Sequence, residues 1–413
     1  MRVVQINGGV FGSTGTIMFG ISEQLKINGD KCLCFSPVTV TNRDKDPGYE
    51  YEKIGPYNSR RVNVLLDRIT GFSGCFSYFV TGKVIKKIKR YSPDIIQLHN
   101  IHGGFINAPR LFRFIKKSNI SVVWTLHDCW AFTGHCPHYD MISCDKWKTE
   151  CHACPLYKEY PQSFFDNSRK MFRRKKKWFL DIRNMTIVTP SAWLASQARQ
   201  SFLGGYPIHT VNNGIDLSVF HPMKSDFRKE HGISDSQKIV LGVAFGWNER
   251  KGLDVFEKLS EKLDFDEYKI VLVGVDENTL VNWPDNIIAI RRTQNKTELA
   301  KIYSTADVFV NPTREDNFPT VNIEALACGV PVVTFDTGGS GEILDDCCGR
   351  IIKKNDINML VRAVLDICRG KDFIDRKQCV HRAASFNKDD KFAEYVKLYE
   401  ELIHNERSSK SRI

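Results

Sequence analysis

The sequence predicts an α/β protein with two Rossmann-like domains. Apolar segments typical of strands alternate with segments of helical periodicity twice along the chain, which is the pattern of parallel sheets with crossover helices. The chain has 413 residues, too many for one hydrophobic core, and this length indicates two or three domains. A stretch rich in turn residues, from Asn212 to Lys238, separates the two series.

The elements are expected in a regular order. In the first half we expect strands at 2–7, 31–36, 94–99, 121–126 and 186–189, and helices at 14–28, 79–91, 107–118 and 191–202. In the second half we expect strands at 238–244, 268–273, 286–290, 307–310, 331–335 and 350–353, and helices at 251–263, 296–305, 320–328 and 357–369. The predicted domains are 1–212 and 238–385, joined by a linker at 213–237. Residues 386–413 hold a final amphipathic helix, at 389–404, and a polar tail expected to fray.

Composition indicates a globular protein that stays in the cytoplasm. Hydrophobic residues make up 42% and charged residues 26% of the chain, as in soluble domains. No apolar run reaches the roughly 18 residues that a membrane span needs. The first residues enter a strand directly and lack the pattern of a signal peptide, so the 13 cysteines are expected to be mostly reduced.

The net charge of +11 favours anionic partners. The densest basic run, at 169–179, mixes arginine and lysine with phenylalanine and tryptophan, a combination that suits an anionic membrane surface. The alternative is an ordinary solvated helix face. Nucleic acid is not expected as a partner, because no recognisable binding motif accompanies the charge. The expected location is therefore cytoplasmic, with peripheral attachment to the inner face of the membrane as an option.

Residues 311–333 are the most informative segment. An apolar strand runs into a polar turn, a helix begins near Thr320, and Gly329 ends it before a second strand. The N–H groups at the helix start favour an anion, and the carboxylates of Asp316 and Glu324 can accept hydrogen bonds from sugar hydroxyls. Together these groups suit a nucleotide sugar. The alternative is an ordinary buried helix with a capped start.

The same segment resembles the donor-site signature of the large retaining glycosyltransferase family 4. That signature is E-x7-E followed by Ala-Leu/Met-Ala-Cys-Gly-x-Pro-Val-Val, and the run that starts at Glu324 fits it throughout. Asp316 stands at the position of the first glutamate, with Glu315 directly before it. Spacing favours Asp316, but which of the two carboxylates reaches the sugar is left open.

The resemblance implies the GT-B fold, in which two Rossmann-like domains face each other across a cleft and a final helix packs back on the first domain. It implies a hexosyltransferase-type enzyme that transfers a sugar, with retention of configuration, from a UDP- or GDP-linked donor. The implied acceptor is a carbohydrate or a lipid-linked saccharide, such as one on polyprenyl diphosphate. Bacterial surface polysaccharide synthesis (O-antigen, capsule or exopolysaccharide) is the family's commonest use. No cofactor is required for catalysis in this family.

The resemblance also assigns site residues in the second half. Lys251-Gly252 matches the family's phosphate-binding Lys-Gly, whereas Gly246 stands where an arginine is usual, so Arg250 is expected to supply the second cation. The alternative is a surface turn. The implied donor contacts also include Asn317, Phe318 and Thr320, beside the catalytic Asp316 and Glu324.

In the first half, a glycine-rich turn after the first strand precedes a helix. Such a turn lets a backbone approach a ligand, and the family places a similar loop against the donor diphosphate, so Gly12, Ser13 and Gly15 are candidates. A merely tight turn is the alternative.

Histidines stand at the ends of two successive predicted strands. His127 and Asp128 follow the strand at 121–126, and the resemblance implies that His127 lies near the transferred sugar as a catalytic residue. His99 ends the preceding strand in chain order and, with Asp128, is a weaker candidate for the acceptor side. A structural histidine is the alternative reading of His127.

A cysteine-rich loop at 135–155 is the last feature. Cys136, Cys144, Cys151 and Cys154 fall within it, and in a reducing compartment four thiolates suit a tetrahedral structural zinc. Their C-x7-C-x6-C-x2-C spacing is irregular, so free thiols and an iron–sulfur cluster are the alternatives. A zinc here would stiffen the loop after His127 and shape the acceptor pocket.

Two other functions fit parts of the sequence. A basic membrane- or nucleic-acid-binding protein with a zinc-stabilised loop explains the charge and the cysteines, but leaves the paired acids unexplained. A nucleotide-sugar epimerase on the same fold explains the acids, and product analysis without an acceptor separates it from a transferase.

Overall fold

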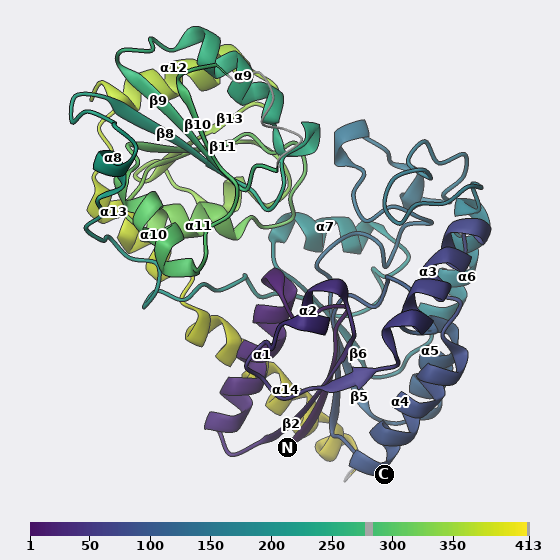
Figure 1. The fold of residues 1–413 in the computed structure, drawn as a ribbon. Coiled ribbons are helices and arrows are strands. Elements are labelled where there is room, and N and C mark those ends of the chain that lie inside the picture. Colours follow the sequence, from purple (N-terminus) through teal and green to yellow (C-terminus); the bar gives the residue numbers. More distant parts are fainter. Residues whose placement is uncertain (277–283, 411–413) are drawn as a thin grey trace. The chain divides into compact units, whose positions relative to one another are not determined.

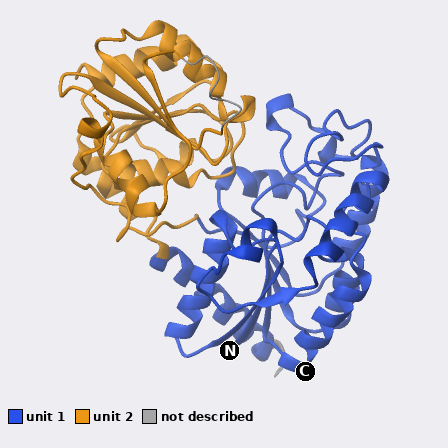
Figure 2. Cartoon of the chain, viewed as in Figure 1, with its two compact units in different colours: residues 1–212, 389–413 blue, residues 213–388 orange. Residues whose placement is uncertain are grey.

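The computed structural model describes residues 1–276 and 284–410, with side chains described as far as residue 408. It divides into two compact units, Met1–Asn212 with Asp389–Ile413, and Asn213–Lys388 (Figures 1 and 2). The segment 213–237, expected as a linker, falls within the second unit. In the part that the structure describes, no helix has both the length and the apolarity that a membrane crossing needs.

Unit 1 is built on a parallel sheet with the strand order β3-β2-β1-β4-β5-β6-β7. Its strands are β1 (Arg2–Ile6), β2 (Lys31–Pro37), β3 (Glu52–Ile54), β4 (Ile95–Leu98), β5 (Ser121–Thr125), β6 (Met185–Thr189) and β7 (Ile208–Thr210). Its helices are α1 (Gly12–Ile27), α2 (Val40–Asp44), α3 (Tyr57–Thr70), α4 (Tyr78–Tyr91), α5 (Ala108–Lys117), α6 (Ser168–Phe179), α7 (Ala192–Gln200) and α14 (Lys388–Lys410).

Unit 2 is built on a second parallel sheet, with the strand order β10-β9-β8-β11-β12-β13. Its strands are β8 (Lys238–Val243), β9 (Tyr268–Val273), β10 (Ile287–Ile290), β11 (Val308–Asn311), β12 (Val332–Phe335) and β13 (Gly349–Ile352). Its described helices are α8 (Phe227–Glu230), α9 (Leu253–Lys262), α10 (Lys296–Thr305), α11 (Thr320–Ala327), α12 (Ile357–Cys368) and α13 (Arg376–Ala384). Short 3-10 turns stand at Glu249–Lys251 and Gly341–Ile343.

Each sheet is covered on both faces, which explains why its strands are almost continuously apolar. In β1, Val4 and Ile6 contribute to the core on one face of the sheet while Val3 contributes to the core on the other. The strands and helices that we expected are present, with ends shifted by a few residues. The short edge strands β3 and β7, and the helices α2, α3, α6, α8 and α13, were not predicted.

Helix α14 completes the core of unit 1. Phe392, Tyr395 and Tyr399 pack with α1 and the sheet, and a Cβ at Gly20 of α1 would collide with the Phe392 ring. The Tyr399 hydroxyl donates to Gln97 Oε1 at 2.8 Å, so a buried polar group of β4 is satisfied by the chain's last helix. The helix continues to Lys410, past the expected end at residue 404.

The basic run at 169–179 forms α6, and its rings point inward. Phe172 and Phe179 are buried in the main core of unit 1, and Lys175 is buried with its amine donating to the Trp130 and Thr133 carbonyls at 2.6 and 3.1 Å. The expectation that exposed rings from this run would meet a membrane is therefore wrong for both phenylalanines. The exposed residues of α6 form a solvated basic face.

We predict that Phe392→Ala destabilises unit 1 by about 3–5 kcal/mol, because it leaves a cavity between α14 and α1. Denaturant unfolding followed by circular dichroism measures the loss. Phe373→Ala is the matched control, since that ring is 82% exposed and should change stability by less than about 0.5 kcal/mol. Equal effects of the two substitutions would show that α14 does not support the core.

Candidate active site

Two loops meet where the sheet of unit 2 reverses its order. From β8 the chain proceeds to β9 and β10 on one side, whereas β11, β12 and β13 extend from the other side of β8. In open α/β sheets, ligands bind beyond the carboxyl ends of the strands at such a switch point. The loops after β8 and β11 lie at this switch point, and they hold the residues expected from the sequence.

An ion pair joins these loops. Lys251 Nζ lies 2.6 Å from Asp316 Oδ2, and both side chains are about one-fifth exposed, at 22% and 23%. The Lys251 turn is closed by Asn248, whose side-chain oxygen accepts from the Lys251 N–H at 3.0 Å. Gly252 follows with a φ of +78°, and a Cβ there would collide with the Pro312 carbonyl, so the turn requires glycine. The sequence thus brings a cation and a carboxylate together at the strand ends.

Arg250 and Arg314 have different surroundings. Arg250 Nη1 donates to the Glu315 carbonyl at 3.2 Å, and its own carbonyl accepts from the Arg314 N–H at 2.8 Å. The Arg314 guanidinium is buried and makes a bidentate pair with Asp254, both contacts at 2.7 Å. Arg314 therefore holds the loops together, whereas Arg250 and Lys251 are the cations of this edge that were predicted to meet phosphate.

Glu324 lies on α11, half-buried. The Tyr303 hydroxyl of α10 donates to Glu324 Oε2 at 3.2 Å, and Tyr303 itself is fully buried. Burial raises the pKa of Glu324 to about 7, although hydrogen bonds from Tyr303 and Thr320 oppose that rise. Tyr303 was not predicted, because no sequence pattern links it to a residue 21 positions later.

The other predicted donor contacts differ in how accessible their side chains are. Glu315 is only 7% exposed, so of the two adjacent acids Asp316 is the more accessible. Asn317 and Phe318 are buried, and the Phe318 ring packs on Phe386 within the core of unit 2. Phe318 therefore has a packing role whatever else it contacts.

The glycine-rich turn of unit 1 follows β1, at the switch point between β1 and β4. Gly12 has a φ of +77°, and both Gly12 and Ser13 are exposed at the start of α1, which has no side-chain cap. This uncapped helix start offers N–H groups to an anion. Gly15 is different, because a Cβ there would collide with the Val10 backbone. Packing alone therefore explains why this position is a glycine.

Three side chains form a hydrogen-bonded chain at the same edge. Gln5 Nε2 donates to the Met18 carbonyl at 2.8 Å, which orients the amide and leaves Gln5 Oε1 as the acceptor 3.0 Å from His99 Nε2. His99 Nδ1 in turn lies 3.0 Å from His127 Nε2. Both histidines were predicted at strand ends, whereas their contact and the role of Gln5 were not predicted.

This chain fixes the protonation of both histidines. Burial lowers the pKa of His99 well below its ordinary value, helped by His127, and lowers that of His127 to about 4, so both rings are neutral at pH 7. His99 Nε2 must carry the proton donated to Gln5, so its Nδ1 accepts. His127 Nε2 must therefore be the N–H donor, and its Nδ1 is the acceptor nitrogen.

A second polar chain lies beside it. His102 Nε2 is 2.8 Å from Asp128 Oδ2, and His102 Nδ1 is 3.0 Å from the Tyr160 hydroxyl. Burial tends to raise the pKa of Asp128, but His102 and the Trp130 N–H outweigh it and lower that pKa to about 2. The carboxylate is thus ionised and accepts from His102. Such a chain can hold or pass a proton, and neither His102 nor Tyr160 was predicted.

The four loop cysteines interact with one another and with the nearby backbone. The thiols of Cys136 and Cys154 are hydrogen-bonded to each other, while Cys151 Sγ accepts from the Gly134 N–H at 3.2 Å. Among residues 1–276 and 284–410, no group of three or more His, Cys, Asp or Glu is placed to hold a metal ion. Zinc at Cys136, Cys144, Cys151 and Cys154 stays a prediction, for metal analysis of the reduced protein to decide.

Known proteins resemble both halves of the chain. Residues 17–219 match the family model described as Glycosyltransferase Family 4, and residues 223–386 match the one described as Glycosyl transferases group 1. The chain is 24% identical to WcaC of Escherichia coli (strain K12), named as a colanic acid biosynthesis glycosyl transferase, over 75% of this chain and 77% of that protein.

Solved structures share the fold. Sucrose-phosphate synthase from Thermosynechococcus elongatus gives a TM-score of 0.73 at 18% identity and covers 98% of this chain and 100% of that one. HepE of Anabaena, solved in complex with UDP-glucose, gives a TM-score of 0.63 at 12% identity and covers 96% of this chain and 99% of that one. The expectation of two parallel-sheet α/β domains of the GT-B type is confirmed.

We predict that both His99 and His127 are Nε2–H tautomers near pH 7. Nitrogen chemical shifts of the imidazole rings, measured by NMR, report the tautomer directly. Gln5→Leu removes the acceptor of His99 and should let the pair exchange tautomers, while Gln294→Leu in unit 2 is a control without this contact. An Nδ1–H signal from His127 in the wild type would contradict the assignment.

We predict that Glu324 makes stability fall as pH rises from about 4.5 to about 7, because its pKa is raised from 4.5 to about 7 by folding. The folded state binds the proton more tightly than the unfolded state, so the stabilisation is complete below about pH 4.5 and is lost as pH passes 7. The melting temperature of the wild type should therefore fall, relative to that of Glu324→Gln, as the pH rises through this range. Glu400→Gln, at an exposed position of α14, is the control for removing a carboxylate, and parallel curves for Glu324→Gln would refute the prediction.

Proposed function

We propose that this chain, a glycosyltransferase with the GT-B fold, transfers a hexosyl group from a UDP- or GDP-linked sugar with retention of anomeric configuration. The observation that supports this most is the Lys251–Asp316 pair with Glu324, beside the start of α11 at the switch point of unit 2. Cations and a helix start suit a diphosphate, and carboxylates suit sugar hydroxyls. A neighbour of the same fold, HepE, is named as a complex with UDP-glucose.

The proposed roles follow from the surroundings of each group. Lys251 and Arg250 would take up negative charge on the leaving diphosphate, as preorganised cations do in other enzymes. Asp316 and Glu324 would fix the sugar and ribose hydroxyls. No metal is required at the diphosphate in this proposal, because the two cations and the helix start supply positive charge.

On unit 1, His127 would contact the transferred sugar. As an Nε2–H tautomer held by His99, it would present a neutral ring with an acceptor nitrogen, without adding positive charge to an oxocarbenium-like transition state. The ionised Asp128, with His102 and Tyr160, would serve the acceptor side, where an acceptor hydroxyl needs a group that takes its hydrogen bond.

We further propose a saccharide or polyprenyl-diphosphate-linked acceptor, and a role in bacterial surface polysaccharide synthesis (O-antigen, capsule or exopolysaccharide). The name of WcaC, which refers to colanic acid biosynthesis, supports this setting. The enzyme would act in the cytoplasm, at the inner face of an anionic membrane.

We predict that one nucleoside diphosphate raises the melting temperature, because a ligand that binds only the folded state stabilises it by about 2.7 kcal/mol at one hundred times its Kd. UDP, GDP, ADP and their sugar conjugates form the screen. Lys251→Ala should weaken binding by about tenfold or more, since it removes a charge-assisted contact. Lys258→Ala is the matched control, because it removes an exposed lysine of α9 whose ion pair, with Asp254 at 3.8 Å, lies on the helix surface.

Product analysis completes this test. A product with retained configuration, formed only when an acceptor saccharide is present and lost in Glu324→Gln, is the expected result. Interconversion of the nucleotide sugar without any acceptor would identify an epimerase instead. No shift with any nucleotide, in protein that is folded by circular dichroism, would overturn the donor site.

A further inference from the structure

Helix α3 presents an apolar stripe to solvent. Val62, Leu65, Leu66 and Ile69 are 56%, 53%, 36% and 43% exposed. Their i, i+3, i+4 and i+7 spacing places them on one face of the helix. This stripe is therefore a continuous surface and not a set of scattered apolar residues.

The opposite edge of α3 is buried, and it is polar. Asn63 and Asp67, one turn apart, are the buried residues of this helix, and the Asn63 amide donates to Ser77 Oγ. A surface helix normally turns its apolar face to the core and its polar face to water. In α3 this order is reversed, so packing within unit 1 does not explain the apolar stripe.

The exposed charges beside the stripe are all basic. Arg61 and Arg68 flank it, and with Tyr57, Arg60, Val64 and Leu65 they line a shallow groove of about 320 Å³. The helix's one acidic residue, Asp67, lies on the buried edge. The surface of α3 therefore combines apolar contacts with positive charge alone.

Segments next to α3 add further exposed apolar side chains. Phe164 and Phe165 are 59% and 62% exposed, and their segment is attached to the end of α3 by the Phe164 N–H, which donates to the Arg68 carbonyl at 2.9 Å. Phe79, at the start of α4, is 83% exposed and follows Ser77, the partner of Asn63. We call α3 with 163–165 and Phe79 the α3 surface.

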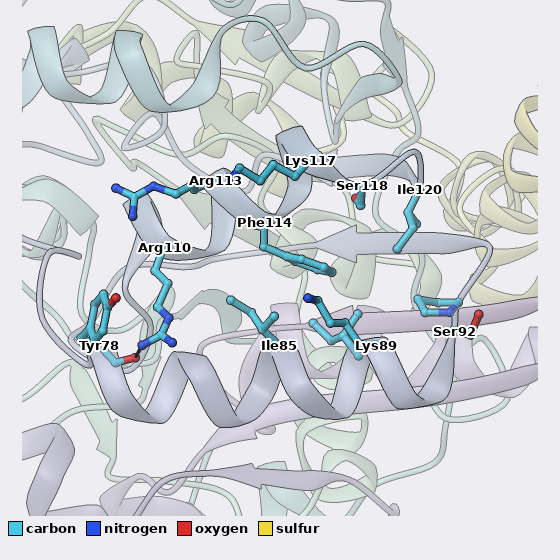
Figure 3. A pocket seen from close by; sticks show the side chains of 12 residues that line it. Tyr78, Ile85, Lys89, Ser92, Arg110, Arg113, Phe114, Lys117, Ser118 and Ile120 are labelled. Carbon is cyan, nitrogen blue, oxygen red and sulfur yellow. Dashed lines mark hydrogen bonds between the residues drawn. The ribbon is translucent and has the colours of Figure 1, made fainter.

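A groove lies between α4 and α5, and Tyr78, next to Phe79 in the sequence, is one of its lining residues (Figure 3). It has a volume of about 500 Å³ and an apolar floor that includes Phe114. Its charged lining residues are all cationic, namely Lys89, Arg110, Arg113 and Lys117. An anionic headgroup with an apolar tail matches both parts of this lining.

We propose that the α3 surface docks on an anionic lipid bilayer, with the α4–α5 groove taking a lipid phosphate. Interfacial helices bury an apolar face at the headgroup boundary while basic residues contact anionic lipid. A second copy of this chain fits the surface poorly, because a two-fold interface would bring the same arginines of both copies together.

The docked bilayer would lie beside the acceptor-side chain of unit 1. Arg60 Nε donates to the Gly103 carbonyl at 3.1 Å, and a Cβ at Gly104 would lie 2.7 Å from Val64. His102, the partner of Asp128, is in this same loop. A lipid-borne acceptor would therefore reach Asp128 and His102 from the membrane, a step that rests on the proposed function.

Flotation with vesicles tests the docking without any donor or acceptor. The full chain should bind vesicles of phosphatidylcholine mixed with phosphatidylglycerol, and bind phosphatidylcholine alone much more weakly. Val62→Ser with Leu66→Ser should lower partitioning roughly tenfold, because two apolar contacts are lost. Ile27→Ser, which changes a 74% exposed residue of α1, is the matched control and should leave partitioning unchanged.

A charge-reversal pair locates the surface. Arg61→Glu with Arg68→Glu should abolish binding to the anionic vesicles, whereas Lys170→Glu with Lys177→Glu, on the solvated face of α6, should reduce it much less. Equal losses in both pairs, or none in the α3 pair, would overturn the proposal. So would a dimer, seen by light scattering, that dissociates in the serine variant without any change in vesicle binding.

The docking and the donor site can fail separately. The α3 variants should keep the wild-type circular dichroism and the wild-type thermal shift with the nucleotide that binds. Loss of vesicle binding with an intact nucleotide shift supports the α3 surface even if the donor assignment changes. Loss of both the fold and the shift in the serine variant leaves the charge-reversal pair to decide.

Discussion

The ion pair between Lys251 and Asp316 is the contact on which the candidate donor site depends. The two residues are far apart in sequence and meet only because the sheet reverses its order between β8 and β11. Two glycines allow these loops to come close together. A Cβ at Gly252 would collide with the Pro312 carbonyl, and a Cβ at Gly338 would collide with the Asp316 carbonyl. The half-buried carboxylate holds the amine in a fixed position at this edge. In the proposed reaction, a cation would therefore be in place before a diphosphate binds.

Two carboxylates, one in each unit, have pKa values that their surroundings shift in opposite directions. Asp128 has a pKa lowered to about 2, while Glu324 has one raised to about 7. Asp128 accepts hydrogen bonds from His102 and the Trp130 N–H. Burial raises the pKa of Glu324, and Tyr303, Lys296 and Thr320 offset only part of that rise. Asp128 is thus a permanent anion, while Glu324 is able to change its charge near neutral pH. Such separation of pKa values commonly marks different chemical roles.

Sequence patterns predicted the sheets well and the polar networks only in part. Long apolar strands and glycine-bounded helices are local features, so β1, β5, β8 and α11 were expected near their true ends. The edge strands β3 and β7 have three residues each, too few for a period to show. Lys251, Asp316 and Glu324 came from a motif. The structure pairs Lys251 with Asp316 and places Glu324 on α11, the helix that follows the Asp316 loop. Gln5, His102, Tyr160 and Tyr303 could not be predicted, because each meets its partner through the tertiary fold and has no local signature.

Helix α3 shows why periodicity alone does not decide which face of a helix is buried. Periodicity reveals that Val62, Leu66 and Ile69 share a face, but it does not reveal whether that face meets the core or the solvent. Helix α6 follows the usual arrangement, because Phe172 and Phe179 are buried in the core and the exposed basic residues face water. In α3 the core takes Asn63 and Asp67 instead, and the exposed stripe costs free energy as long as it stays in water. The anionic bilayer proposed as the partner of α3 would remove this stripe from water and bring negative charge to the arginines beside it.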